Sequence, residues 1–326
     1  MPKRQKVQDS QAEQTLAVVT KIVAEGKCIL FLGAGVHYPP PNGSPYSYPE
    51  KERPPLGTTF SEHLAKKTNF AARFPSESIG NLQRVSQDYE VRFQRSGLLR
   101  EIKDAVYTNK QPSPVLRALA GMKFPVVITT NYDQLFEKAL RESGKDPFVS
   151  VYKKNEDRSE VTEDYPYDDE VTPNRPFIFK IHGDIISNPE STVITDEDYI
   201  QFVLRMSDKQ EYHPVPETIR FYFKKWPTLF IGYSLKNYNL RLLFKTLRWK
   251  IDEAGFPPAY SVDLYPDPLI LDVWHNQRRY INFVARDVWA FIPELYKRVL
   301  GPDSPYRGIE AFRFVDNPVC FARKGN

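Results

Sequence analysis

The chain has 326 residues, which suits one large domain or a main domain carrying a helical insertion. Apolar residues make up 41% and charged residues 26%, as in ordinary soluble proteins. The net charge is +4, with acidic and basic residues interspersed, which neither demands nor excludes nucleic acid; we expect no direct nucleic-acid binding. No apolar stretch approaches the roughly 20 residues that cross a bilayer. The polar N-terminus does not look like a secretory signal, so we expect a cytoplasmic protein without membrane contact.

Cysteine and histidine usage argues against metal chemistry. Cys28 and Cys320 are the only cysteines, which excludes a disulfide framework and a four-cysteine zinc site within one chain. The histidines lack the short spacing of metal ligands; they are His37, His63, His182, His213 and His275. We therefore expect no metal.

The first part of the chain predicts a helix, a strand and then a long loop. Residues 11–26 have an amphipathic pattern that stops at a glycine, and the buried strand 28–32 follows. Residues 37–57 are rich in proline, glycine and tyrosine, and loops of this length often act as lids or binding loops. Residues 58–120 look helical throughout and predict a subdomain inserted after the first strand. Thr59 or Ser61 could cap its first helix.

The rest of the chain alternates between strands and helices. With the first strand, the predicted strands are 28–32, 125–133, 177–184, 227–234, 259–265 and 280–285. Helices are expected after several of them, at 134–143, 237–251 and 287–300. A further short strand near Val193 leads into a helix with Asp196 as its N-cap, whereas residues 150–175 look irregular. This alternation predicts an α/β fold with a doubly wound, Rossmann-like parallel sheet.

Unusual residues stand at the ends of four predicted strands. These four clusters are Gly33-Ala34-Gly35, Thr129-Thr130-Asn131-Tyr132-Asp133, His182-Gly183-Asp184 and Gly232-Tyr233-Ser234. In a doubly wound sheet, ligands bind at the carboxyl ends of the strands. If the sheet is parallel, all four clusters therefore converge on one crevice.

Each cluster also has a purely structural interpretation. Asn131 and Asp133 could simply cap the following helix, and His182 could be a satisfied core histidine. Gly232 could mark a tight turn. The glycine turn 33–35 lacks the third glycine of a dinucleotide fingerprint, because that position is Tyr38. The coincidence of four such clusters favours a binding site.

The four motifs together resemble the sirtuin superfamily. "GAGVH" is similar to the family's phosphate loop, "TTNYD" to its Asn-x-Asp motif, "KIHGD" to its catalytic histidine turn and "GYSL" to its second phosphate-contacting turn. The resemblance covers about residues 15–300. The sequence around these motifs is most similar to that of the zinc-less bacterial branch found in antiviral defence operons, whose members hydrolyse and deplete NAD.

The chain also departs from the family. It cannot supply the four zinc-binding cysteines of sirtuin deacylases. His37 stands where the family usually has a serine, at a reach that could contact a phosphate. The proline-rich loop 38–57 replaces the family's Gly-Ile-Pro-Asp-Phe-Arg segment. The peptide-binding features of deacylases are therefore not carried over.

The resemblance implies catalytic roles for three side chains, with NAD as the substrate. Asn131 would hold a ribose hydroxyl and position water, and Asp133 would contact the nicotinamide amide. His182 would bond the ribose hydroxyls and act as general base, with Asp184 orienting its imidazole. The NAD-binding residues implied are Gly33, Ala34, Gly35, Val36, Thr130, Gly232, Tyr233, Ser234 and Asp263. Among them, the amides of 33–36 and the Ser234 hydroxyl would bind pyrophosphate, and Asp263 a ribose hydroxyl of the adenosine.

The resemblance further implies a catalytic domain over 1–300, with a tail at 301–326 that could contact an oligomer mate or a partner. Such an effector is expected to act by abortive infection, as a homo-oligomer, under a regulator such as a HerA-type ATPase, a short Argonaute or a phage trigger protein. Two alternatives keep the NAD site: a protein deacylase or ADP-ribosyltransferase, and a non-catalytic NAD or ADP-ribose sensor. A dehydrogenase is disfavoured, because no acidic residue ends a strand about 20 positions after the glycine turn.

Overall fold

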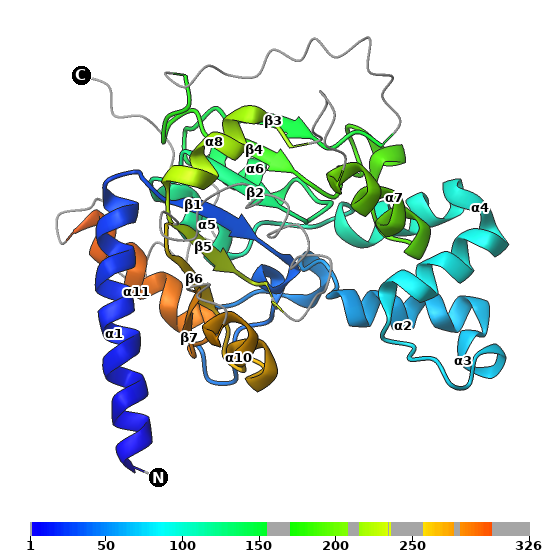
Figure 1. The fold of residues 1–326 in the computed structure, drawn as a ribbon. Helices are drawn as coiled ribbons and strands as arrows, with labels where there is room; N and C mark the ends of the chain where they lie inside the picture. The colour runs from blue at the N-terminus through cyan, green and yellow to red at the C-terminus, as the bar shows by residue number, and fades with distance from the viewer. Residues whose placement is uncertain are drawn as a thin grey trace.

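A computed structural model describes residues 2–154, 170–207, 215–233, 235, 257–276 and 281–301. Its centre is a seven-stranded parallel sheet in the order β3-β4-β2-β1-β5-β6-β7 (Figure 1). The strands are β1 (Ile29–Leu32), β2 (Val126–Thr129), β3 (Phe148–Val151), β4 (Phe177–Lys180), β5 (Thr228–Ile231), β6 (Ala259–Val262) and β7 (Ile281–Val284). The predicted α/β, Rossmann-like fold class is confirmed.

Helices cover both faces of this sheet, which explains why its central strands β1, β2, β4 and β5 are buried at every position. One face packs on α1 (Pro2–Ala24), α5 (Pro114–Gly121), α6 (Leu135–Glu142) and α11 (Val288–Leu300). The other face packs on α7 (Asp196–Ser207), α8 (Glu217–Lys225) and α10 (Pro268–Asn276). Alternate strand residues divide between the two cores: Leu30 and Leu32 face the first, and Ile29 and Phe31 the second. All residues of β1 are consequently buried.

A separate helical cluster lies beyond the carboxyl edge of the sheet, beside α7 (Figure 1). It contains α2 (Gly57–Thr68), α3 (Phe70–Arg73) and α4 (Leu82–Val106), which share their own apolar core. Ile185 and Ile194, which follow β4 in the chain, also belong to this core. The helix α5 instead packs against α6 and α11 on the sheet. The inserted helices therefore lie beside the edge of the sheet where the strands end.

Several predicted details are wrong. Leu56 is the N-cap of α2, and neither expected hydroxyl caps it; the Ser61 hydroxyl donates to the Ile79 carbonyl instead. Val193 does not lie in a strand. The N-cap of α7 is formed by Thr195, whose hydroxyl accepts from the Asp198 amide, rather than by Asp196.

Some elements were not predicted at all. Strand β3 was not predicted, and its last two residues fall in the stretch 150–175 that was expected to be irregular. Helices α8 and α10 follow prolines and were given no prediction. The predicted helix 237–251 and the tail 302–326 lie outside the described residues. Within the described ranges, the chain has no helix long and apolar enough to span a membrane.

Candidate functional site

The four strand-end clusters lie side by side. The strands β4, β2, β1 and β5 are consecutive neighbours in the sheet, and their last residues are in register: Leu32 pairs with both Thr129 and Ile231, and Thr129 pairs with Lys180. The segments that leave these strands therefore start from one edge. The predicted placement at one sheet edge is confirmed for the described residues of the four clusters.

The two glycine turns interlock at the centre of this edge. The Gly35 amide donates to the Gly232 carbonyl at 2.8 Å. A Cβ on Gly35 would lie 2.7 Å from the Gly232 oxygen, and a Cβ on Gly232 would lie 2.2 Å from the Val36 nitrogen. Gly232 also has a φ of +67°, in the left-handed region that favours glycine. Glycine is thus needed on both sides of this contact.

Most amides of the first glycine turn already have partners. Those of Gly33, Gly35 and Val36 donate to the carbonyls of Ile231, Gly232 and Gly33, respectively. The Ala34 amide takes no part in these bonds, and Ala34 is exposed. Of the amides expected at a pyrophosphate, Ala34's is therefore the one left for a ligand. The other amides of this turn serve the packing of the two turns, and the Ala34 amide alone among these four remains available.

Tyr233 closes the same turn from β5. Its ring meets Phe31 edge-on at 5.4 Å, and its hydroxyl shares a hydrogen bond with Thr130. Burial raises the pKa of this phenol, so it stays protonated. Ser234, the next residue, lies outside the described residues.

The loop after β2 carries Asn131 and Asp133 at this edge of the sheet. The Asn131 amide donates to the Thr129 hydroxyl at 3.1 Å, which fixes the backbone. The Asn131 side-chain oxygen is buried and has no hydrogen-bond partner within the described chain. An unsatisfied buried acceptor is uncommon in a folded protein and marks a place where a ligand or water can donate.

Asp133 combines a structural role with a position in the site. Its Oδ1 accepts from the Leu135 backbone N–H at 2.9 Å at the start of α6, although the N-cap of this helix is Gln134 and not Asn131 or Asp133. Its Oδ2 lies 3.1 Å from His37 Nε2. Burial would raise the pKa of this carboxyl, but the neighbouring His37 and the Lys180 charge outweigh burial and hold it below the ordinary value. Asp133 is therefore ionised.

His182 follows β4 in an apolar setting. Its ring packs edge-to-face against the rings of Tyr199 and Phe202, with ring centres 5.3 and 5.4 Å apart. The ring makes no hydrogen bond to the described part of the chain. Burial lowers the pKa of His182 to about 3. The imidazole is thus neutral at physiological pH, although the sequence suggested a pKa near neutrality. It can accept a hydrogen bond from a ligand, but a pKa this low makes it a weak proton acceptor and argues against the expected role as general base.

A buried lysine supports the loops on which these groups stand. Lys180, the last residue of β4, is fully buried; its ammonium lies 2.8 Å from Glu137 Oε1 and 2.6 Å from Asp184 Oδ2. The same ammonium donates to the Asp133 carbonyl. Burial opposes the charge, but the surrounding carboxylates raise the pKa of Lys180 overall. Sequence reasoning missed this residue, although a lysine inside an apolar strand was a visible signal.

Asp184 belongs to this support rather than to the imidazole. Besides Lys180, its carboxylate accepts from the amides of Ile186 and Ser187 and from the Gln134 side chain. It has no contact with His182, so the expectation that it orients the ring is wrong.

His37 and the loop that follows it are anchored. His37 is 1% exposed, and its Nδ1 lies 3.3 Å from the Tyr48 hydroxyl. Tyr46 stacks on Trp289 of α11 with ring centres 5.8 Å apart, and the Trp289 indole donates to the Tyr38 carbonyl. His37 thus points to Asp133 rather than towards a ligand phosphate, and this part of loop 37–57 is packed on the body.

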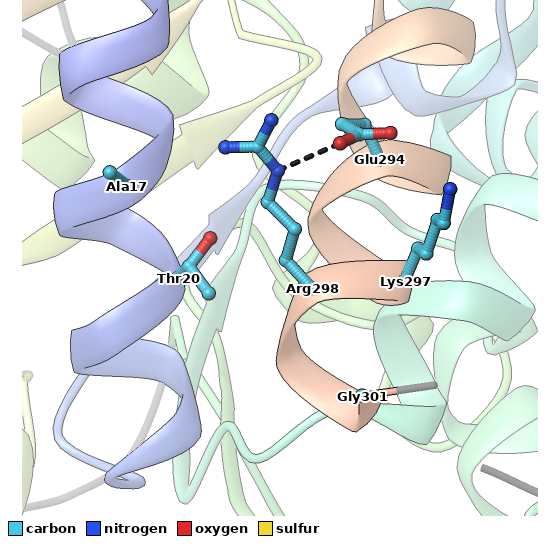
Figure 2. A pocket seen from close by; sticks show the side chains of 6 residues that line it. All are labelled: Ala17, Thr20, Glu294, Lys297, Arg298 and Gly301. Atoms are coloured by element: carbon cyan, nitrogen blue, oxygen red, sulfur yellow. Dashed lines mark hydrogen bonds and ion pairs between the residues drawn. The ribbon is translucent and has the colours of Figure 1, made fainter. Parts of the chain in front are cut away.

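Asp263 follows β6, next to β5, at the same sheet edge. It is half-buried, and its carboxylate accepts from the Tyr265 amide at 3.0 Å. Among the described residues, no group of three or more His, Cys, Asp or Glu side chains could hold a metal ion. A groove of about 450 Å³ lies between α1 and α11, lined by Ala17, Thr20, Glu294, Lys297, Arg298 and Gly301 (Figure 2). None of the predicted site residues lines it.

Comparison with known proteins supports the resemblance read from the motifs. Residues 125–282 match the model of the SIR2-like domain. This range begins just before β2 and ends within β7, so it includes the Asn131, His182 and Gly232 segments. This part of the chain is therefore similar to a SIR2-like domain, whereas the first glycine turn lies outside the matched range.

Individual relatives agree. Defense-associated sirtuin 2 of Bacillus subtilis is 24% identical over 266 residues, which cover 80% of this chain and 23% of that protein. NAD(+) hydrolase ThsA of Enterococcus faecium is 34% identical over 141 residues, covering 43% of this chain and 26% of that protein. NAD(+) hydrolase ThsA of Bacillus cereus is 25% identical over 232 residues, covering 70% of this chain and 41% of that protein. The chain thus spans about a quarter of the first two relatives.

Proposed function

We propose that this sirtuin-like chain hydrolyses NAD at the nicotinamide–ribose bond, giving nicotinamide and ADP-ribose. The observation that carries the proposal is the meeting of Asn131, with its unsatisfied oxygen, and His182, with its neutral imidazole, at one sheet edge beside two interlocked glycine turns. Relatives named NAD(+) hydrolase support the same reaction.

The reaction needs little covalent chemistry from the protein. The bond between the ribose anomeric carbon and the nicotinamide nitrogen breaks, and its electron pair leaves with neutral nicotinamide. A water oxygen bonds to the same carbon and releases one proton. Asn131 would orient this water and a ribose hydroxyl through its free oxygen, His182 would accept a hydrogen bond from one of them, and the released proton would pass to solvent. Asp133, held ionised, would accept from the carboxamide of nicotinamide.

The binding residues would distribute along the edge in the order of the strands. The Ala34 amide and the Ser234 hydroxyl would contact the pyrophosphate, on a frame set by Gly33, Gly35, Val36 and Gly232. Thr130 and Tyr233 would line the space between the two turns. Asp263, one strand further out, would accept from a ribose hydroxyl of the adenosine.

The first test is NAD consumption by purified protein, with products identified by chromatography. Asn131→Ala and His182→Ala should each lower NAD hydrolysis by at least about 100-fold at unchanged folding, because each removes a group needed near the transition state. His63→Ala is the matched control, since His63 is half exposed and pairs with Glu101 in the helical cluster. Full hydrolysis by either site variant would overturn the assignment.

The same assay separates the alternatives. Nicotinamide release that requires a protein acceptor would support a deacylase or ADP-ribosyltransferase. Binding of NAD without consumption, alone or with the neighbouring operon product, would support a sensor. Free ADP-ribose in stoichiometry with nicotinamide supports the hydrolase.

The cellular role follows from the same proposal. The chain would act in the cytoplasm as a homo-oligomeric effector that depletes NAD in phage-infected bacteria, causing abortive infection. Its catalytic domain would cover 1–300, with the tail 301–326 as a contact segment. Because unrestrained NAD loss harms the host, a regulator such as a HerA-type ATPase, a short Argonaute or a phage trigger protein would control it. The name of the B. subtilis relative supports the defence role.

A further inference from the structure

We propose that His37 is a positioning residue that fixes the Asp133 carboxylate for the carboxamide of the substrate, and that Tyr48 holds His37 in this orientation. The inference rests on the proposed NAD hydrolysis and deepens it, because it names the groups that set recognition of the amide. It also gives His37 a role other than the phosphate contact that the sequence suggested.

The geometry isolates His37 from solvent and commits both its ring nitrogens. Its Nε2 lies 3.1 Å from Asp133 Oδ2, and its Nδ1 lies 3.3 Å from the Tyr48 hydroxyl. The side chains of His37 and Asp133 are only 2% and 6% exposed. Because an ionised carboxylate only accepts hydrogen bonds, the Nε2 atom carries the proton and donates it.

Asp133 is then held at three points, two on its carboxylate and one on its backbone. His37 binds Oδ2, the Leu135 amide binds Oδ1 at 2.9 Å, and the Lys180 ammonium binds the backbone carbonyl of the same residue. Each carboxylate oxygen can accept more than one hydrogen bond, so the group stays able to accept from a substrate N–H. A carboxylate fixed in this way discriminates strongly, since it attracts an amide donor and repels a second carboxylate.

Tyr48 is itself fixed from two directions. Its hydroxyl lies 3.0 Å from the Gln111 carbonyl, just before α5, and 3.3 Å from His37 Nδ1, and its single proton can be donated in only one of these two contacts. Its ring lies against Trp289 of α11, with ring centres 6.4 Å apart. The order of support therefore runs from α11 through Tyr48 and His37 to Asp133, and joins the proline-rich loop to the reacting end of the site.

Two substitutions at His37 separate positioning from simple packing. The side-chain nitrogen of His37→Gln can reach the place of Nε2 and donate to Asp133, whereas that of His37→Asn can reach only the place of Nδ1, beside Tyr48. Each variant thus keeps one of the two contacts. The readout is kcat/KM for NAD and for its deamido analogue, nicotinic acid adenine dinucleotide, in which a carboxylate replaces the carboxamide.

We expect His37→Gln to keep kcat/KM for NAD within about fivefold of wild type. His37→Asn should lower it by about 10- to 100-fold, the range of effects seen when a supporting hydrogen bond to an active-site group is lost. The preference for NAD over the analogue should shrink in His37→Asn and persist in His37→Gln. Tyr48→Phe, which keeps the ring on Trp289, should lower the NAD rate by less than His37→Asn.

Thermal unfolding of the same samples supplies the structural control. Equal rates for the Gln and Asn variants would overturn the positioning role, as would a loss of rate at unchanged preference between the two dinucleotides. If wild type consumes NAD and this pattern fails, only the inference about His37 falls. If wild type consumes no NAD with its operon partner present, the proposed function fails and takes this inference with it.

Discussion

Replacing Lys180 by methionine tests the buried charge cluster beneath the site. The substitution keeps an unbranched side chain but removes the only cation within 3 Å of Glu137 Oε1 and Asp184 Oδ2 in the described chain. Lys180 is fully buried, and the two carboxylates are almost so. Breaking a buried ion pair by removing one partner costs about 3–5 kcal/mol, because it leaves uncompensated charge in a poorly solvated place. That is a large share of the 5–15 kcal/mol typical of folded domains.

The two carboxylates should respond differently. Asp184 keeps the amides of Ile186 and Ser187 and the Gln134 side chain. Glu137 loses its cation, and burial already raises its pKa above the ordinary value, so it will protonate. When the pKa of a carboxyl is higher in the folded than in the unfolded chain, the free energy of unfolding falls as the pH rises from the unfolded pKa to the folded one. The Lys180→Met defect should therefore be larger at pH 8 than at pH 5.

Urea unfolding of a double-mutant cycle measures this directly. Glu137→Gln added to Lys180→Met should recover at least about half of the lost free energy of unfolding, because it removes the uncompensated charge. A single-variant loss below about 1 kcal/mol would refute the reasoning. So would a double variant less stable than the single one at both pH values.

Two further predictions concern stability near the strand ends. Burial lowers the pKa of His182 to about 3, so below about pH 6.5 the unfolded chain binds a proton that the folded chain does not. Between pH 6 and 4, the free energy of unfolding of wild type should therefore fall by about 1.4 kcal/mol more per pH unit than that of His182→Phe. Equal pH slopes of the two free energies in urea titrations would contradict this. Gly232→Ala should destabilise by well over the 1–2 kcal/mol of left-handed strain alone, because its Cβ would meet Val36 N at 2.2 Å. Gly144→Ala, also at positive φ but with nothing within 4 Å, is the matched control, and equal losses of Tm would count against the interlock.

The fold was largely predictable because its strands are buried on both faces. β1, β2, β4 and β5 appear in the sequence as short apolar runs bounded by glycine or polar turns, and the parallel arrangement followed from the helices between them. β3 was not predicted because its sequence, FVSV, runs directly into the charged stretch that follows. The α7 boundary was missed by one residue, because Thr195 and Asp196 are both good N-caps and only the backbone geometry distinguishes them.

The site was predictable in outline but not in its pairings. Parallel strands bring their ends together, so the meeting of Asn131 with His182 needed only the strand order. The His37–Asp133 contact joins residues 96 positions apart, and the Lys180–Glu137 contact residues 43 apart. Side-chain partners at such separations are set by tertiary packing and leave no local pattern. The neutral state of His182 likewise depends on Tyr199 and Phe202, which come from another element.

The strand order also bears on synthesis of the protein. β1 sits between β2, on the side built by the chain up to β4, and β5, on the side built afterwards. β1 pairs with β5, and just beyond it the Gly35 amide bonds to the Gly232 carbonyl. These contacts close a loop of about 200 residues, and such long-range pairing forms slowly. A ribosome-bound chain that has emerged only to His182, just after β4, already carries Asn131 and His182. Gly232 has not yet been made, so the Gly35 amide of the first glycine turn lacks its hydrogen-bond acceptor. The order of translation thus delays completion of the site until the second half of the sheet has been made.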